Sequence, residues 1–298
     1  MRNLTVLREE LLMVRPKTVG AGNPASKHVV IGNNSRTVLN TILLGLPAEE
    51  RHAIFSKLEF LSLPVPMALN VDGERIKHIY FINDGLASVL KVMEDGNSIE
   101  VGLCGKEGFV GLPLLAGYSS SPTRIIMQVG GSGFRMSAND FSAALLACPT
   151  LLTSLRQFAQ ELALQSEQIA ACNRLHDVEQ RLARWLLMCQ DRLGGDVVPL
   201  THTFLAHMLG TRRASVTDAL GALQDAKLVS CARSRVKIES RKKLENAACE
   251  CYAELTNQIE KWHQEAGDIK RGRQRAVRAP AAGVQFLARR HHIDVRDF

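Results

Sequence analysis

Two adjacent arginines, Arg212 and Arg213, stand just after Gly210, between two stretches of helical spacing. A guanidinium group binds anions, and it also binds the acceptor edge of guanine, so this pair could contact a nucleic acid. Alone the pattern is weak, because a glycine after a helix end and charges on a first helical turn are both common. What the pair does depends on the elements that position it.

The segment around the pair is strongly basic. From Leu200 to Lys243 the chain has nine lysines and arginines against three acidic residues, a net charge of +6. Residues 1–173 are neutral, whereas residues 174–298 carry the whole excess of +7. A local excess of positive charge favours a polyanionic partner, although solvated basic faces are also common.

Cysteines and histidines are the other candidates for chemistry. The seven cysteines are odd in number and scattered, which indicates reduced thiols in an intracellular protein. Cys249 and Cys251 form a lone C-x-C pair, for which a structural role is favoured over metal binding. His202 and His207 are five residues apart, which separates them on a helix. We therefore expect no metal site and no cofactor.

Two short helices would position the arginines. The first is predicted over residues 202–209, with Thr201 as its N-cap and Gly210 as its stop. The second begins at Arg212 or Arg213 and runs to about residue 226. Two short helices joined by so tight a turn make a helix-turn-helix.

The residues at the turn fit this unit. It needs a small residue where the helices touch, a residue that tolerates positive φ, and a branched apolar residue that holds the second helix down. Ala206, Gly210 and Val216 meet these needs in that order. The segment VSCARSRVKIES then alternates like a small basic hairpin, which predicts a winged helix. An ordinary helical hairpin is the alternative.

Upstream, the pattern changes to the period of β-strands. Two hairpin signals, Asp84-Gly85 and Asp95-Gly96, predict antiparallel strands. The glycine-rich run 130–133 is predicted to end a further strand. Many short strands punctuated by glycine indicate a sandwich, jelly roll or barrel.

A long helix is predicted after the strands, from about Thr150 to Cys172, preceded by a short helix that Asn139 caps. Its apolar positions alternate steps of three and four over three heptads, so the stripe is either one face of a core helix or a seam with a second subunit. We predict the seam, because a solitary amphipathic helix between two compact regions must hide a whole stripe. The residues assigned to dimerisation are Leu151, Leu155, Phe158, Leu162 and Ile169.

Over roughly residues 38–245 the chain resembles the Crp/Fnr family of bacterial transcription regulators. The most specific segments are HDVEQRLARWLLMC and PLTHTFLAHMLGTRRASVTDALGALQDAKLV. The resemblance implies an α+β fold with an N-terminal antiparallel β-roll or jelly roll of the cyclic-nucleotide-binding kind, a long dimerisation helix, and a C-terminal winged helix-turn-helix that binds DNA.

The implied organisation has five parts. They are a disordered extension (1–36), the sensor β-roll (37–137), the dimerisation helices (138–173), the DNA-binding domain (174–245), and a helical then basic disordered tail (246–298).

The recognition helix departs from the family pattern. Family members that read guanine carry an Arg-Glu pair followed by a further Arg; here Arg213 keeps the first place, Ala214 replaces the Glu, and Asp218 stands near the later Arg. We expect Arg213 to contact guanine, while Asp218 either accepts from a cytosine amino group or balances local charge. The residues expected at DNA are Thr201, Thr203, Arg212, Arg213, Ser215, Thr217, Asp218, Arg233, Arg235 and Lys237.

The β-roll also departs from the family's cyclic-nucleotide site. There a Gly-Glu pair holds the ribose and a later Arg-Ser-Ala or Arg-Thr-Ala holds the phosphate, whereas here Phe109 replaces the carboxylate and Arg124 is displaced past Pro122 and Thr123. We predict that cyclic AMP is not the switch. The possible effector pocket comprises Phe109, Val110, Thr123 and Arg124, and its apolar part is either a hydrophobic effector site or a filled core.

Other cofactors and activities are less favoured. The N-terminal cysteine cluster of oxygen-sensing relatives is missing. A haem could use His78 and Cys104, but a single strand histidine is more often structural. A cupin-like metal enzyme needs clustered histidines and carboxylates, and the strand region offers only His78, so we expect no enzyme.

Together these patterns predict a cytoplasmic homodimer that binds double-stranded DNA at an inverted repeat and acts with RNA polymerase. We expect no membrane partner, since no run approaches 18 apolar residues. The alternative is an interaction module that binds nucleic acid without sequence preference.

Overall fold

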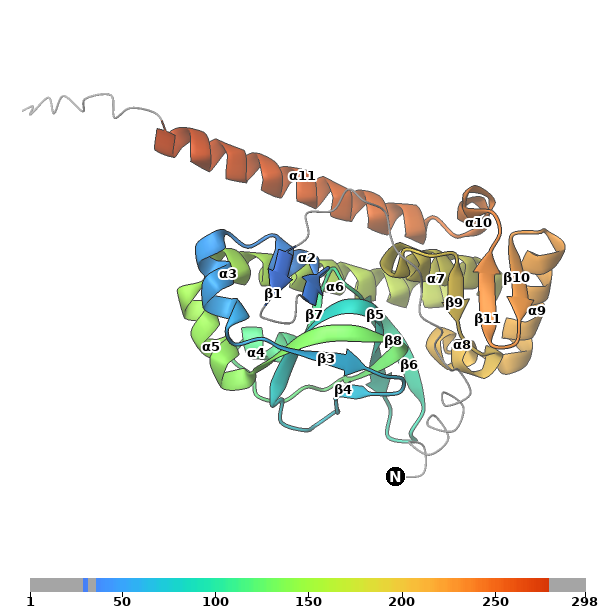
Figure 1. The fold of residues 1–298 in the computed structure, drawn as a ribbon. Helices are drawn as coiled ribbons and strands as arrows, with labels where there is room; N and C mark the ends of the chain where they lie inside the picture. Colours follow the sequence, from blue (N-terminus) through green and yellow to red (C-terminus); the bar gives the residue numbers. More distant parts are fainter. Residues whose placement is uncertain (1–28, 32–35, 279–298) are drawn as a thin grey trace, which may run out of the picture. The chain divides into compact units, whose positions relative to one another are not determined.

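The computed structural model describes residues 29–31 and 36–278, with side-chain burial from residue 36 to residue 269. The chain forms two compact units, residues 1–255 and 256–298. An antiparallel sheet domain and a helical domain with a small sheet make up the first unit, so the fold is α+β, as predicted (Figure 1). No described helix combines the length and the apolar character that crossing a membrane requires.

A six-stranded antiparallel sheet forms the N-terminal domain. Its main path runs β3-β8-β5-β6, while β4 pairs with β8 and β7 pairs with β5. The strands are β3 (Glu59–Leu63), β4 (Ala68–Asn70), β5 (His78–Val92), β6 (Ser98–Cys104), β7 (Phe109–Val110) and β8 (Arg124–Ser137). Short helices accompany them: α2 (Thr41–Leu44), α3 (Ala48–Phe55) and α4 (Leu112–Leu115).

One of the two predicted hairpins is wrong. Asp95-Gly96 does turn the chain between β5 and β6, with the Met93 amide donating to the Asn97 carbonyl at 2.8 Å. Asp84-Gly85 instead lies inside the continuous strand β5, at a point where its register with β8 shifts. The glycine-rich run 130–133 likewise passes through β8. These glycines are needed because a Cβ at residue 131 would overlap the Asp84 carbonyl, so the two sequence signals together build a bulge.

Two helices follow the sheet, α5 (Ala138–Ala147) and α6 (Pro149–Leu175). The cap of α5 is Ser137 and not Asn139, because the Ser137 hydroxyl accepts from the Asp140 amide at 3.1 Å. Helix α6 runs three residues further than the predicted end at residue 172.

The apolar stripe of α6 packs inside this chain. Leu151 and Leu155 are fully buried, and Phe158 is 5 % exposed, all within the core of the β-roll. Leu151, Leu155 and Phe158 are therefore already enclosed by their own sheet, which leaves these three side chains little surface for a partner. The role of the stripe at a subunit seam stays a prediction. Leu162 packs against the same core and Ile169 is also buried.

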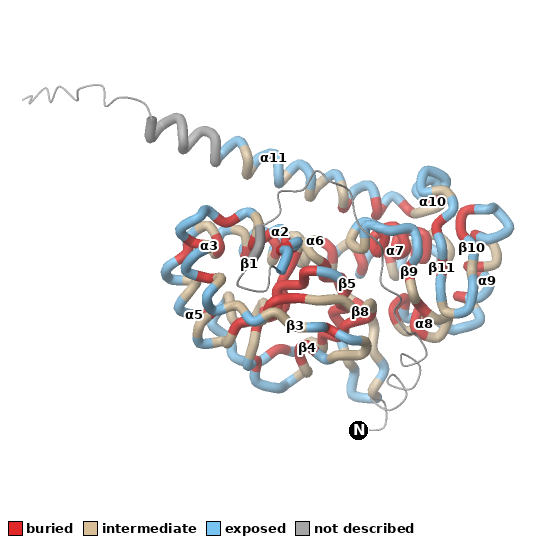
Figure 2. The backbone as a smooth tube through the Cα atoms, in the orientation of Figure 1, coloured by how far each residue is buried: buried red, intermediate tan, exposed pale blue. Residues whose placement is uncertain are grey.

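The C-terminal part of the first unit has the predicted winged helix-turn-helix. Its elements are α7 (Val178–Leu193), β9 (Val197–Pro199), α8 (His202–Leu209), α9 (Arg213–Asp225), β10 (Val229–Ala232), β11 (Arg235–Ile238) and α10 (Arg241–Ala247). The small sheet has the order β10-β11-β9. Helix α7 is its core, because residues 181–190 are all buried (Figure 2).

The two ends of the chain are described in part. β1 (Val29–Ile31) pairs antiparallel with β2 (Arg36–Val38), so one strand lies within the extension predicted as disordered. Helix α11 (Cys251–Arg278) crosses from the first unit into the second. The rest of the predicted extension, and the tail from residue 279 onward, lie outside the described residues.

Candidate nucleic-acid interface

Local capping chemistry sets the position of helix α8. The Thr201 hydroxyl accepts from the Phe204 amide at 3.2 Å, as an N-cap does. At the other end Gly210 adopts φ 57°, and its amide donates back to the carbonyls of Ala206 and His207. A Cβ at residue 210 would also come within 2.5 Å of Ile99 on β6, so this turn is held by both its conformation and its packing.

Helix α9 presents its first turn to solvent. Val216 and Leu220 are buried at 0 % and 1 % exposure and fix the inner face of the helix. Arg213, Thr217 and Asp218 are exposed on the outer side. The Thr217 hydroxyl donates to the Arg213 carbonyl at 3.1 Å. The arginine predicted to read DNA therefore sits at the N-terminal end of α9, with its side chain in solvent.

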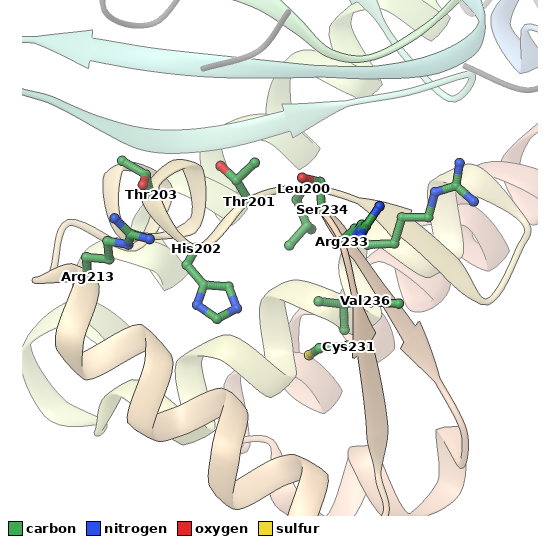
Figure 3. Close-up of a pocket in the computed structure, with 11 residues that line it drawn as sticks. Leu200, Thr201, His202, Thr203, Arg213, Cys231, Arg233, Ser234 and Val236 are labelled. Carbon is green, nitrogen blue, oxygen red and sulfur yellow. The ribbon is translucent and has the colours of Figure 1, made fainter. Parts of the chain in front are cut away.

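A groove of about 630 Å³ lies between the start of the helix-turn-helix and the wing (Figure 3). Thr201, Thr203 and Arg213 line its helical side, and Arg233 and Arg235 line it from the β10–β11 hairpin. His202 lines it too, with Nδ1 3.2 Å from the Thr217 hydroxyl. The sequence did not predict this residue at DNA, because its spacing from His207 bears only on metal binding. The structure thus brings five of the predicted DNA-contacting residues around one groove.

The other predicted contacts lie apart from this groove. Arg212 and Ser215 line a second hollow, of about 690 Å³, next to Asn97 and Ile99 of the β5–β6 hairpin. Lys237 forms an ion pair with Glu239 at 2.8 Å, and this hydrogen bond raises the pKa of Lys237. Its charge is therefore already partly balanced within the wing.

The groove arginines are not balanced in this way. Within the described residues, the groove residues Arg213, Arg233 and Arg235 have no carboxylate within 4.0 Å, and the same holds for Arg212 beside the second hollow. All four arginines are exposed. Four unpaired guanidinium groups near one helix end and one hairpin favour an extended anion such as a nucleic-acid backbone.

The residues assigned to an effector pocket do not form one group. Phe109 and Val110 are each 2 % exposed, and the Phe109 ring packs 5.7 Å from Phe158, so this half is filled core. Arg124 forms an ion pair with Asp72 at 2.7 Å. Phe109 pairs with residue 81 of β5 and Arg124 with residue 90, nine residues apart, or roughly 30 Å of strand.

The two candidate haem ligands are separated in the same way. His78 begins β5, whereas Cys104 pairs with Ala87, nine residues further along that strand. Cys104 is 1 % exposed, and burial raises the pKa of its thiol well above the ordinary value. The structure therefore does not bring this histidine and this thiol to one site.

Comparison with known proteins gives the same assignment for the DNA-binding domain. A model of the Crp-like helix-turn-helix domain matches residues 180–247. The global nitrogen regulator of Synechococcus elongatus is 27 % identical over 177 residues, which cover 56 % of this chain and 79 % of that protein. The global nitrogen regulator of a Nostoc species is 25 % identical over 178 residues, covering 56 % and 78 %.

Solved structures agree on the fold. FixK2 from Bradyrhizobium japonicum has a TM-score of 0.57 at 15 % identity, covering 64 % of this chain and 98 % of that one. A putative Crp/Fnr regulator from Eubacterium rectale has a TM-score of 0.55 at 14 % identity, covering 69 % and 96 %. With the groove and the helix-turn-helix already described, the chain contains a Crp-like helix-turn-helix DNA-binding domain, and it is similar in sequence and in fold to transcription regulators of the Crp/Fnr type.

Proposed function

We propose that the chain is a homodimeric, sequence-specific regulator that reads an inverted DNA repeat with helix α9. The observation that carries this proposal is the groove that Arg213 and the wing residues Arg233 and Arg235 line without carboxylate partners in the described residues. Arg213 contacts a base edge in the major groove, because the first turn of a recognition helix is the part that reaches the bases. Arg233 and Arg235 contact phosphates beside it.

This division of roles predicts two different mutant phenotypes. Arg213→Ala should lower affinity for the operator by about 1–3 kcal/mol and relax the base preference at one position in each half-site. Arg233→Ala should weaken specific and random DNA alike and reduce the dependence on salt by about one phosphate contact. Lys91→Ala, an exposed cation of β5 outside the interface, is the matched control and should leave both affinities unchanged.

The experiment is a selection of bound genomic fragments by the purified protein, followed by binding to the selected site and to random DNA at several salt concentrations. An enriched inverted repeat, with half-sites about one helical turn apart, supports the proposal. Binding that shows no preferred site supports the alternative, an interaction module that contacts nucleic acid only through charge. Equal losses on both DNAs for Arg213→Ala make that residue another phosphate contact.

The subunit contact in this proposal uses the outer face of α6. With the apolar stripe enclosed by the β-roll, the exposed side of the helix carries the small residues Ala163 and Ala170. Small side chains let a second helix approach closely, and the outer face of α6 is continuous over the length of the helix.

A charge placed on that face tests the contact. Ala163→Arg should give monomers in sedimentation and much weaker operator binding, because two copies of the new charge would meet at the two-fold axis. Gln157→Arg introduces the same charge at another exposed position of α6, about 120° around the helix, and should remain dimeric. Dimers from both variants would place the interface elsewhere.

A further inference from the structure

Four potential metal ligands meet where the DNA-binding domain joins α6. They are the thiols of Cys172, Cys249 and Cys251 and the imidazole of His176, and their ligand atoms all lie within 4.8 Å of one another. The Cys172 and Cys249 sulfurs are 3.5 Å apart, as are the Cys251 sulfur and His176 Nδ1. The three cysteines are buried, and the His176 side chain is 14 % exposed.

The two separations of 3.5 Å suit a single tetrahedral ion. Zinc binds thiolate sulfur at about 2.3 Å and imidazole nitrogen at about 2.0–2.1 Å, so the ligand atoms around it lie roughly 3.5–3.8 Å apart. Three cysteines and one histidine form one of the closed ligand sets of structural zinc sites. An iron–sulfur cluster spreads its cysteines around several irons and requires wider spacing. We propose that Cys172, His176, Cys249 and Cys251 bind one zinc ion.

The carboxylate of Glu250 supports this assignment, because it contacts the ring nitrogen of His176 that does not face the thiols. Its Oε2 lies 3.1 Å from His176 Nε2, while His176 Nδ1 faces the Cys251 sulfur. A histidine that ligates a metal usually donates its other ring N–H to a carboxylate or carbonyl, which fixes the ring and the tautomer. Glu250 therefore orients His176 so that Nδ1 offers its lone pair to the ion.

Two buried arginines supply the second, independent argument. Arg181 and Arg184 are 7 % and 2 % exposed, and in the described residues neither has a carboxylate within 4.0 Å or a partner for its Nε atom. The positive charge of Arg184 acts on the Cys172 thiol and also on the Glu100 carboxyl. Zinc with three thiolates carries a net charge of −1, which is the charge that such buried guanidinium groups require. On zinc binding each thiol releases its proton to solvent.

The ligands flank the whole DNA-binding domain. Cys172 and His176 close α6, whereas Cys249 and Cys251 lie at the start of α11. The Crp-like domain occupies residues 180–247, so one ligand pair precedes it and the other follows it. A bound zinc would fasten both ends of this domain to the end of α6. The site is independent of the proposed DNA readout, and it can be measured in the absence of DNA.

Metal content is the first test. Full-length protein purified from cells under reducing conditions should contain one zinc per chain by elemental analysis. Cys172→Ala and Cys249→Ala should lose the zinc, whereas Cys231→Ala, which removes a thiol from the wing, should keep it. Far-ultraviolet circular dichroism identifies any variant that has failed to fold.

Cobalt substitution is the second test and needs no variant. Co²⁺ in the unaltered protein should show the intense visible bands of tetrahedral coordination together with sulfur-to-cobalt charge transfer. Glu250→Gln should keep this spectrum and bind zinc about 10–100-fold more weakly, because it loosens the histidine without removing a ligand.

Three outcomes would overturn the proposal: protein without stoichiometric metal, zinc retained equally by Cys249→Ala, or a Cys172–Cys249 disulfide in protein isolated from cells. Stoichiometric iron in place of zinc would overturn the assignment of the ion. An octahedral cobalt spectrum without sulfur-to-cobalt bands would overturn the assignment of the ligands.

Discussion

The indole Nε1 of Trp185 donates a 2.7 Å hydrogen bond to Oε1 of Glu100, which joins helix α7 of the DNA-binding domain to strand β6 of the β-roll. Glu100 is 2 % exposed, and in the described residues its second oxygen, Oε2, has no hydrogen-bond partner. Burial raises the pKa of this carboxyl from 4.5 to about 7. A contact between the two domains therefore contains a group that titrates near neutral pH.

We expect this carboxyl to make the stability of the protein depend on pH. Its pKa is higher in the folded chain than in the unfolded chain, so folding is favoured most below pH 4.5 and loses this contribution as the pH rises through about 7. The full difference is roughly 3 kcal/mol. Glu100→Gln keeps an acceptor for Trp185 and removes the titration. The measurement is urea unfolding of both proteins from pH 5 to pH 8.

The difference between the two proteins isolates Glu100 from all other titrating groups. The variant should gain stability relative to the unaltered protein as the pH rises across this range. A difference that stays constant with pH would show that Glu100 does not titrate there.

Leu155 provides a test of where the α6 stripe packs. Because this side chain is fully buried in the β-roll core, Leu155→Ala should lower the free energy of unfolding by roughly 2–5 kcal/mol through the cavity that it leaves. The loss should be the same at every protein concentration. Gln157→Ala, on the exposed side of α6, is the control and should cost little. If Leu155→Ala kept its stability but dissociated into monomers, Leu155 would lie in the subunit interface instead.

Local signals explain what the sequence could predict. Thr201 and Gly210 cap helix α8 through contacts with residues only a few positions away. The helix-turn-helix was therefore predicted with nearly its observed bounds. Asp84-Gly85 and Asp95-Gly96 are similar as dipeptides, yet only the second is a turn. Asp84-Gly85 forms a bulge within β5 instead, because the glycines of β8 leave room for its backbone.

Sequence spacing could not predict the contacts between residues that lie far apart in the chain. Cys172 and Cys249 are 77 positions apart, and their approach depends on how the end of α6 packs against the start of α11. The C-x-C pair alone gave no reason to add Cys172 and His176 to it. The packing partner of the α6 stripe was open for a related reason, since an a/d pattern is the same whether a helix packs on a sheet or on a second copy of itself.

Gly210 should tolerate substitution poorly. Alanine at this position must adopt φ 57° and would press against Ile99, so Gly210→Ala should cost at least about 1 kcal/mol of stability and weaken operator binding. Gly221→Ala is the matched control in α9, where nothing lies within 4 Å of the new methyl group. It should be neutral or stabilising by up to about 1 kcal/mol. Equal thermal shifts for both variants would contradict this account of the turn.

Cyclic AMP should not act as the switch of this protein. A buried cyclic phosphate needs a cation or several amide donors to offset its desolvation, and Arg124 is already paired with Asp72 at 2.7 Å. The ribose hydroxyl would meet no carboxylate at Phe109, whose ring fills the core. Calorimetric titration with cyclic AMP and cyclic GMP should therefore show no saturable binding in the micromolar range.

Asp72→Asn sharpens this test. It frees the Arg124 guanidinium while keeping the size of its neighbour, and it should still bind no cyclic nucleotide, because the phosphate partner would return without the ribose partner. Micromolar binding by this variant alone would show that the Asp72 ion pair is what blocks the site. Micromolar binding by the unaltered protein that also tightened operator affinity would mean that Arg124 leaves Asp72 to hold the phosphate, and that the prediction is wrong.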